Sequence, residues 1–281
     1  MPATGSECSN IATDYDAEAQ EGMQPLECTT GEFLQIRNHR IPVGKIGVNP
    51  PTGRIGLRKD SQANRRVKSV VWPVVKTRDW LFVDGVIEWV IGRWIRELSD
   101  SKMTFLDIGC GDMRLQRFVP HEVWYNAFDL SLSEFHIERV LKRRSLVNLA
   151  LASVTDIPLE DDKASLLVST QVLEYVSRID LAIDEIHRVA TPEARLLVSI
   201  ANGHCRKYRS KGPHRAHVNF WSQQEFLQLM ESHDFRLLEA DMRGYWIPLP
   251  RRLAKTSYEL PIRSPEEYLN SYLFFVFQPI K

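Results

Sequence analysis

Short apolar runs alternate with helical patterns along most of the chain. Seven runs have the length and the β-branched or aromatic content of strands, namely TFLDIG, VWYNAFD, NLALAS, ASLLVST, ARLLVSI, FRLLEAD and SYLFFVFQ. Between most of these runs, apolar residues recur at helical spacing, over residues 133–143, 181–190 and 222–232. Strands that alternate with helices predict an α/β fold with a mostly parallel sheet covered by helices on both faces.

The segment 79–98 also has apolar residues at helical spacing. Its polar side mixes Asp and Glu with Arg, which favours packing against a sheet over lying on a membrane surface. Residues 1–30 are small, polar and acidic, which predicts a disordered tail. Residues 31–78 predict an N-terminal extension with a basic hairpin, in which KIGVN and RIGLR flank PPTG, serving as a lid or as an appendage. We therefore expect the main domain at residues 79–281, with an inserted segment at 242–270.

Acidic and basic residues balance, with 36 of each among 281 residues. A neutral chain gives no general reason to expect a polyanion partner such as long nucleic acid. The four cysteines show no spacing typical of a metal site and are too few to crosslink a chain of this length, which indicates a reducing cytoplasm. The sequence has no run of about 20 apolar residues and no signal-peptide pattern, so we expect no membrane span.

The stretch LDIGCGDMRL places two glycines, Gly109 and Gly111, at the end of a predicted strand. In a parallel sheet this position suits a ligand, although a tight turn without a ligand also explains a glycine pair. Asp129 ends the next strand, about twenty residues on, where a carboxylate can accept both hydroxyls of a ribose. Asp156, in SVTDIPLEDD, is suited to accept from the amino group of adenine, with Ile157 as an apolar contact for the ring.

Two adenosine cofactors fit this pattern. NAD requires GxGxxG, because its pyrophosphate sits at the helix N-terminus and the third glycine allows close packing. Arg114 stands at that third position. S-adenosylmethionine has no phosphate, and its ammonium group benefits from an acid beside the loop, where Asp107 stands. The sequence therefore favours S-adenosylmethionine.

At this point the motifs resemble those of the class I S-adenosylmethionine-dependent methyltransferases, with a type 11-like methyltransferase domain. LDIGCGDMRL resembles their first motif, AFDLS their second-strand acid, TDIPLEDDKASLLVSTQVLEYV their adenine loop and fourth strand, and EIHRVATPEARLLVSI the helix and fifth strand that follow. The later runs HVNFWSQQEFLQLMESHDFRLLE and SYLFFVFQ resemble the last helix and strands. The resemblance covers residue 79 onward and implies a Rossmann-like, seven-stranded, mostly parallel sheet with one antiparallel edge strand, its last.

The resemblance also implies where the cofactor binds. Its methionine part is expected at Asp107, Gly109 and Gly111, its ribose at Asp129 and Leu130, its adenine at Asp156 and Ile157, and its sulfonium at Gln171 and Leu173. Three positions differ from the common family pattern: Met113 replaces a frequent glycine, Tyr175 stands where LEH is common, and PEA replaces PGG before the fifth strand. We expect Met113 to have ordinary helical dihedrals, since glycine is required only where φ is positive or space is lacking.

Methyl transfer is an in-line displacement that depends on positioning, and a general base assists when the acceptor is a hydroxyl. Candidates for the base are His204, His217 and Glu174, which lie in or near the loop after the fifth strand. The same loop carries five cations and the later insertion two more: Arg206, Lys207, Arg209, Lys211 and Arg215, then Arg251 and Arg252. These cations predict a small anionic acceptor bound by Arg206, Lys207, Arg209 and Arg215, unless the loop is merely solvated.

We expect the acceptor to be a hydroxyl of a glycan precursor or a secondary metabolite. Two alternatives remain open at the level of sequence. A methyltransferase-like protein without activity, acting as a binding or partner subunit, would explain the three departures from the family pattern. An enzyme acting on RNA or protein would use the basic loop and the N-terminal hairpin for docking, and RNA binding would weaken steeply with salt.

Overall fold

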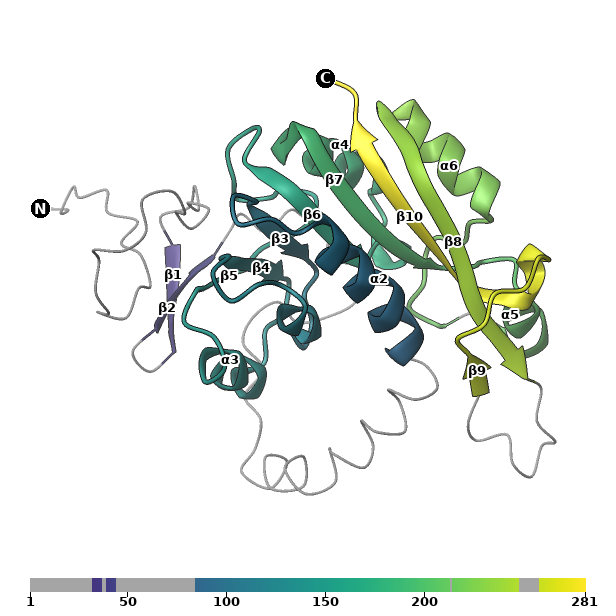
Figure 1. Ribbon diagram of the computed structural model, residues 1–281, viewed down its shortest axis with the longest axis horizontal. Coiled ribbons are helices and arrows are strands. Elements are labelled where there is room, and N and C mark those ends of the chain that lie inside the picture. Colours follow the sequence, from purple (N-terminus) through teal and green to yellow (C-terminus); the bar gives the residue numbers. More distant parts are fainter. Residues whose placement is uncertain (1–31, 37–38, 44–83, 213, 248–257) are drawn as a thin grey trace, which may run out of the picture.

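The computed structural model describes residues 32–36, 39–43, 84–212, 214–247 and 258–281 (Figure 1). The tail predicted at 1–30 and the hairpin predicted around PPTG lie outside these residues. Within the predicted extension 31–78, the described residues form two antiparallel strands, in which Glu32 is opposite Val43.

One mixed sheet runs through the molecule, and the described residues contribute ten strands to it. The strands are β1 (Glu32–Ile36), β2 (His39–Val43), β3 (Phe105–Ile108), β4 (Tyr125–Asp129), β5 (Val147–Leu151), β6 (Ala164–Thr170), β7 (Ala190–Ala201), β8 (Phe235–Ile247), β9 (Tyr258–Leu260) and β10 (Asn270–Pro279). Their order in the sheet is β1-β2-β5-β4-β3-β6-β7-β10-β8-β9.

The seven predicted strands form the centre of this sheet as β3, β4, β5, β6, β7, β8 and β10. The α/β fold with a mostly parallel sheet is confirmed, because β3 to β7 pair in parallel. The expected total of seven strands was too low, since β1 and β2 extend one edge and β9 the other. The antiparallel last strand is confirmed as β10, and it lies between β7 and β8, one place inside the edge of the seven-strand core.

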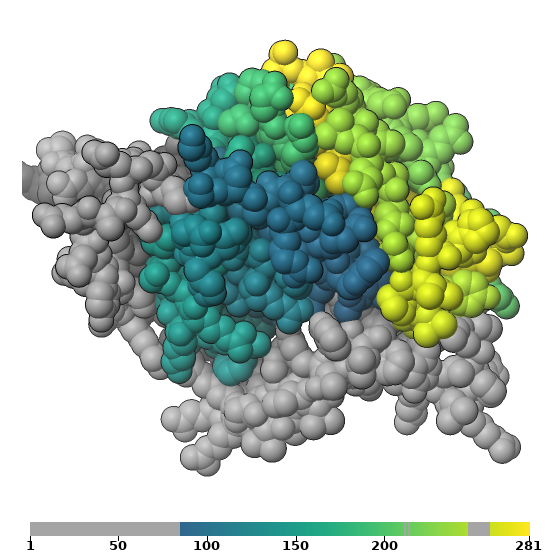
Figure 2. Space-filling view, in the orientation of Figure 1, coloured from purple at the N-terminus to yellow at the C-terminus, as the bar shows by residue number. Residues whose placement is uncertain are grey.

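Helices lie on both faces of the sheet. They are α2 (Asp84–Leu98), α3 (Glu134–Leu141), α4 (Ile179–Val189), α5 (Arg206–Lys211) and α6 (Gln223–Ser232), with short 3-10 helices η1 (Arg114–Arg117), η2 (Leu173–Tyr175) and η3 (Glu267–Leu269). The helices α2 and α3 share one hydrophobic core with the sheet, and α4 and α6 share the other. In Figure 1, α2 crosses in front of the sheet, and in Figure 2 it occupies the middle of the visible face.

The apolar stripe of α2 packs on β7 and β10, which confirms the predicted sheet packing for the described part of that segment. Val90, Ile91 and Trp94 are buried in this contact, and the indole Nε1 of Trp94 donates to Glu239 Oε1 at 3.0 Å. Among the helices that the structure describes, none has the length and apolar character needed to cross a bilayer.

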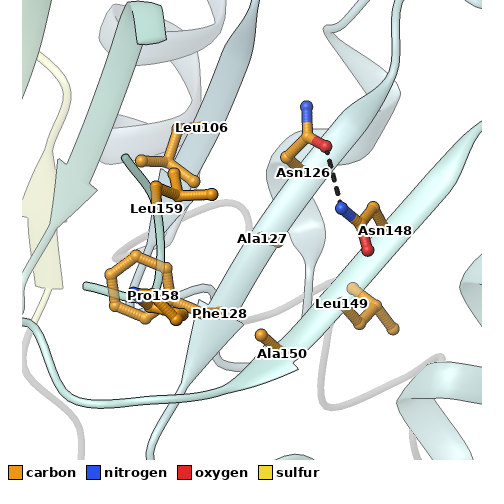
Figure 3. A pocket seen from close by; sticks show the side chains of 9 residues that line it. All are labelled: Leu106, Asn126, Ala127, Phe128, Asn148, Leu149, Ala150, Pro158 and Leu159. Atoms are coloured by element: carbon orange, nitrogen blue, oxygen red, sulfur yellow. Dashed lines mark hydrogen bonds between the residues drawn. The ribbon is translucent and has the colours of Figure 1, made fainter. Parts of the chain in front are cut away.

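The connection from β5 to β6, residues 152–163, contains no helix, so the face of β4 and β5 opposite α3 keeps a shallow groove (Figure 3). Asn148 Nδ2 donates to Asn126 Oδ1 at 3.3 Å along its floor. The groove is lined by Leu106, Asn126, Ala127, Phe128, Asn148, Leu149, Ala150, Pro158 and Leu159. It lies on the face of the sheet, and its lining residue Phe128 is next to the end of β4.

Candidate active site

The glycine loop turns sharply at the end of β3. Gly109 and Gly111 both have positive φ, 68° and 52°, which side chains of L residues rarely adopt. The N–H groups of Gly109 and Cys110 donate to the carbonyl of Phe128 at 2.9 and 3.0 Å, which ties the loop to the end of β4. A Cβ at Gly109 would lie 2.4 Å from Val172 Cγ2, so the loop touches the segment after β6. A Cβ at Gly111 would meet nothing within 4 Å, which leaves a backbone cradle that a ligand can approach.

Met113 does not have the helical dihedrals that we expected. Its φ of 56° and ψ of 37° are left-handed, so it occupies the conformation that favours the family's third glycine. The strain of about 1–2 kcal/mol is offset by burial of its side chain, which is 2 % exposed and packs in the core with α2. Full burial of a methionine contributes about 1.5–3 kcal/mol. The loop therefore keeps its shape without the glycine.

Asp129 holds the loop from the neighbouring strand. Its Oδ2 accepts from the N–H of Gly111 at 2.9 Å and its Oδ1 from the N–H of Ser131 at 3.0 Å. Each carboxylate oxygen has a second lone pair, so these bonds leave acceptors for two ribose hydroxyls. Leu130, which we expect beside the ribose, is half-buried next to this carboxylate.

Asp107 lies beneath the loop and is almost fully buried. The hydroxyl of Tyr125 donates to its Oδ2, whereas its Oδ1 has no hydrogen-bond partner among the described residues. Burial raises the pKa of Asp107 to about 7, and the nearby charges of Asp129 and Asp112 also raise it. An unpaired buried carboxyl oxygen next to an open cradle fits the ammonium group of S-adenosylmethionine.

The remaining predicted cofactor residues lie at the same edge of the sheet. Asp156 closes a turn by donating its N–H to the carbonyl of Ser153 at 3.2 Å, and Ile157 is buried beside it. Gln171 has a positive φ of 54°, and its Nε2 is buried with no partner among the described residues. Leu173, which begins η2, is buried as well. Thus the loops after β3, β4, β5 and β6 together bring the predicted cofactor residues to one edge.

Glu174 joins three segments behind that edge. Its Oε1 accepts from the N–H of Ala201 at the end of β7, and its main-chain carbonyl accepts from Val218 and Asn219 at 2.8 and 3.1 Å. Its Oε2 is buried and finds no partner within the described part of the chain. Burial raises the pKa of Glu174 to about 7. This carboxyl group acts first as a structural link in the wall of the site.

Replacing Glu174 by glutamine should raise stability at alkaline pH, because glutamine can still accept from Ala201 N–H and carries no charge. A carboxyl whose folded pKa is raised from 4.5 contributes stability that is full below pH 4.5 and is lost as the pH rises through about 7. We expect the variant to gain up to about 3 kcal/mol over the native chain at pH 8 and little at pH 5. Urea unfolding at both pH values measures the difference.

The exposed pair Glu160 and Lys163 supplies the control, since Glu160→Gln should change stability equally little at both pH values. A stability difference between Glu174→Gln and the native chain that stays constant from pH 5 to pH 8 would contradict the assigned burial effect. The comparison uses the variant because Asp107, whose pKa is raised in the same direction, adds to the pH dependence of stability in the native chain.

Four rings gather in front of Glu174, and we call them the ring cluster: Tyr175, Tyr208, His214 and His217. His217 is central, with its ring 4.7 Å from that of Tyr175 and its Nδ1 3.1 Å from the hydroxyl of Tyr208. Burial, with smaller contributions from the neighbouring His214 and Lys207, lowers the pKa of His217 to about 4. The imidazole is therefore neutral at pH 7 and able to accept a proton.

His204, the other predicted histidine, lies apart from this cluster. Its Nε2 is 3.2 Å from Glu225 Oε2, at the start of α6 where Ser222 and Glu225 form a capping box, and its side chain is half exposed. The structure therefore brings together His217 and Glu174, but not His204.

The predicted substrate cations divide into two kinds. Lys207 forms an ion pair with Glu259, which is fully buried on β9, and Arg206 lies over the ring of Trp246. Arg209 and Arg215 are exposed and make no ion pair with a described residue. Arg251 and Arg252 lie outside the described residues. The charges of Arg209 and Arg215 are therefore the ones available to an anion.

Sequence patterns missed two contributors to this edge. Tyr125 supports Asp107 from eighteen residues away, and no short-range pattern identifies such a pair. Asn219 donates through Nδ2 to the carbonyls of Leu173 and Val176 at 3.0 and 2.7 Å, so it fixes the 3-10 turn below the cluster. Within the described residues, no group of three or more His, Cys, Asp or Glu side chains is arranged to hold a metal ion.

The sheet order and the glycine loop with its three acids are similar to those of class I S-adenosylmethionine-dependent methyltransferases, which supports S-adenosylmethionine as the cofactor. In agreement, residues 106–198 match the family model described as a methyltransferase domain. This match begins in β3 and ends in β7, so it covers the glycine loop, Asp129, Asp156 and η2. No curated protein matches the chain.

Solved structures share the fold at low sequence identity. A chain of the complex between the Haloferax volcanii Trm112 methyltransferase activator and a candidate methyltransferase has 16 % identity and a TM-score of 0.55, covering 78 % of this chain and 96 % of that one. A SAM-dependent methyltransferase from Aquifex aeolicus has 21 % identity and a TM-score of 0.51, covering 77 % and 98 %. The [4+2]-cyclase SpnF has 15 % identity and a TM-score of 0.52, covering 68 % and 81 %. Because such a fold serves more than one chemistry, the acceptor has to be argued from the site.

Proposed function

We propose that the protein transfers the methyl group of S-adenosylmethionine to a hydroxyl of a small anionic acceptor, with His217 as the proton acceptor. The observation that carries this proposal is the neutral imidazole of His217 in the wall next to the cofactor edge, with Arg209 and Arg215 nearby in sequence. Gly109 touches Val172, and η2 follows directly, so the ring cluster and the glycine loop share one edge.

Each group at this edge has a separate task. The cofactor supplies an electrophilic methyl carbon. Asp107 and Asp129 hold its charged and hydroxyl groups, while Glu174 and Asn219 fix the wall that carries His217. His217 orients the acceptor hydroxyl and takes its proton as the new bond forms. The exposed cations attract and orient the anionic end of the acceptor.

His217→Asn tests the proposal, because asparagine retains a polar side chain but cannot take the proton. We expect kcat to fall about 10²–10⁴-fold with unchanged affinity for S-adenosylhomocysteine. His204→Asn is the matched control and should keep full activity. Since a base must be deprotonated, the native kcat, measured with saturating S-adenosylmethionine so that Asp107 is paired, should stay level as the pH falls from 8 and drop only as it approaches 4.

The assay follows tritiated methyl groups from S-adenosylmethionine into small hydroxy acids, sugar phosphates, total RNA and total protein. Label that enters only RNA or protein would overturn the small-acceptor proposal. If RNA is labelled and its labelling falls steeply as the salt concentration rises, the enzyme acts on RNA. Equal activity of the two histidine variants would remove His217 from its assigned role.

A further inference from the structure

The ring cluster has the geometry of a recognition surface. The rings of Tyr175 and His217 meet edge to face, with an interplanar angle of 86°, while His214 and Tyr208 are tilted to His217 by 49° and 57° at 5.3 and 6.0 Å. Edge-to-face and tilted arrangements are the ones aromatic rings prefer, and a further ring gains the same kind of contact.

The cluster is held rigidly. Glu174 and Asn219 connect η2 to the segment that carries His217 through four hydrogen bonds to main-chain groups. The hydroxyl of Tyr208 fixes the orientation of the His217 imidazole. Tyr175 and Tyr208 have pKa values raised by burial, so both keep their protons. A surface fixed before binding loses little entropy when a ligand is ordered on it.

Apolar surface continues beside the rings. Val218 and Phe220 follow His217 in the chain, and their side chains are 46 % and 41 % exposed. The centre of the Phe220 ring is 6.3 Å from that of the His217 ring. Exposed apolar side chains that adjoin a polar cluster are typical of a binding surface. A planar apolar ligand can cover Val218 and Phe220 while its polar substituents reach the tyrosine hydroxyls and the histidines.

The charged side chains near the ring cluster determine which ligand charge is favoured. Arg209 and Arg215 are positively charged, exposed and unpaired within the described residues. An ammonium ligand would be repelled by these two guanidinium groups, although aromatic rings alone would attract it. A carboxylate or phosphate is attracted.

The low basicity of His217 favours a more acidic type of acceptor hydroxyl. An imidazole held neutral down to a pKa of about 4 is a weak base. An aliphatic hydroxyl is about as weakly acidic as water, whereas a phenolic hydroxyl is much more acidic, with a pKa of about 10. The pKa difference between acceptor and base is therefore much smaller for a phenol. In the transfer, the acceptor oxygen bonds to the methyl carbon, the carbon–sulfur bond breaks with its electron pair passing to sulfur, and the phenolic proton passes to His217.

We propose that the acceptor is a planar aromatic anion whose methylated hydroxyl sits on the ring, bound against Tyr175, His217 and Phe220 with its acidic group toward Arg209 and Arg215. This proposal deepens the proposed function and rests on it for the methyl-transfer step. It replaces the glycan precursor of the sequence prediction by an aromatic hydroxy acid.

The test compares 3- and 4-hydroxybenzoate with 3- and 4-hydroxycyclohexanecarboxylate, which keep the charge and the hydroxyl but lose the aromatic ring. Binding is measured by saturation-transfer NMR on the full chain with S-adenosylhomocysteine present, and turnover by tritiated methyl transfer. We expect at least one hydroxybenzoate to bind about tenfold more tightly than its saturated partner, since each aromatic contact contributes about 0.5–1.5 kcal/mol, and to become methylated.

Two variants make the binding arm specific. Tyr175→Leu should remove the tenfold preference, whereas Tyr175→Phe keeps the ring and should retain it. Equal binding of the aromatic and saturated acids would overturn the aromatic proposal, whatever the turnover. Methylation of glucose 6-phosphate without methylation of either hydroxybenzoate would also overturn it, while leaving the proposed function in place. Tight aromatic binding with methyl transfer only to RNA or protein would instead contradict the proposed function.

Discussion

Gly109→Ala should destabilise the protein by about 2–5 kcal/mol, from the sum of left-handed strain and overpacking. The backbone φ of +68° disfavours any side chain, and the new Cβ would lie 2.4 Å from Val172 Cγ2. Either the loop or the segment after β6 must shift, and both carry predicted cofactor residues. Urea unfolding measures the loss of stability, and calorimetric titration with S-adenosylhomocysteine measures the accompanying loss of affinity.

Gly111→Ala is the matched control, since its φ is also positive but its Cβ would meet no atom within 4 Å. We expect it to lose only about 1–2 kcal/mol of stability, yet to bind the cofactor poorly, because the methyl group enters the open cradle. Adding Val172→Ala to Gly109→Ala should restore part of the lost stability. Equal stabilities for the two single variants would show that the contact with Val172 does not constrain the loop.

Asp129→Ala is expected to reduce the affinity for S-adenosylhomocysteine about 10²–10³-fold. Its carboxylate holds the loop through Gly111 and Ser131 and is the expected partner of the ribose, and hydrogen bonds to a charged group contribute about 1.5–3 kcal/mol each. Calorimetric titration compares the variant with the native chain and with Glu160→Ala, which removes an exposed carboxylate paired with Lys163. NADH serves as the second ligand and should bind to none of them.

Unchanged affinity in Asp129→Ala would exclude this carboxylate from the cofactor site. Micromolar binding of NADH to the native chain would contradict the choice of S-adenosylmethionine over a dinucleotide, which depends on Arg114 standing at the third glycine position.

The local pattern predicted the seven central strands because each is a short apolar run that begins and ends at turn residues. It did not predict the additions at the edges. β2 pairs with β5 through Val43 and Leu151, more than a hundred residues apart, and β9 is only three residues long. Neither run differs from a surface loop until a neighbouring strand supplies its hydrogen bonds.

The positions of Asp107 and Asp129 at strand ends could be predicted from the sequence, and their roles in cofactor binding stay predictions. The candidate site was less predictable where tertiary contacts decide. Met113 adopts a left-handed conformation because the core surrounds its side chain, and a sequence shows only the absence of glycine. His204 and His217 have the same standing in the sequence, but the capping box of α6 engages one and Tyr208 the other.

The position of β10 within the sheet governs the order in which the chain is able to complete its fold during synthesis. Among the described strands, β8 pairs with β10 and β9 alone, and both follow it in the chain. Until residues 270–279 leave the ribosome, β7 is therefore an open edge, and the α6 side of the core lacks the rings of Phe275 and Phe277. A nascent chain at this stage exposes strand edge and aromatic surface together, which are the features that chaperones bind and that promote aggregation.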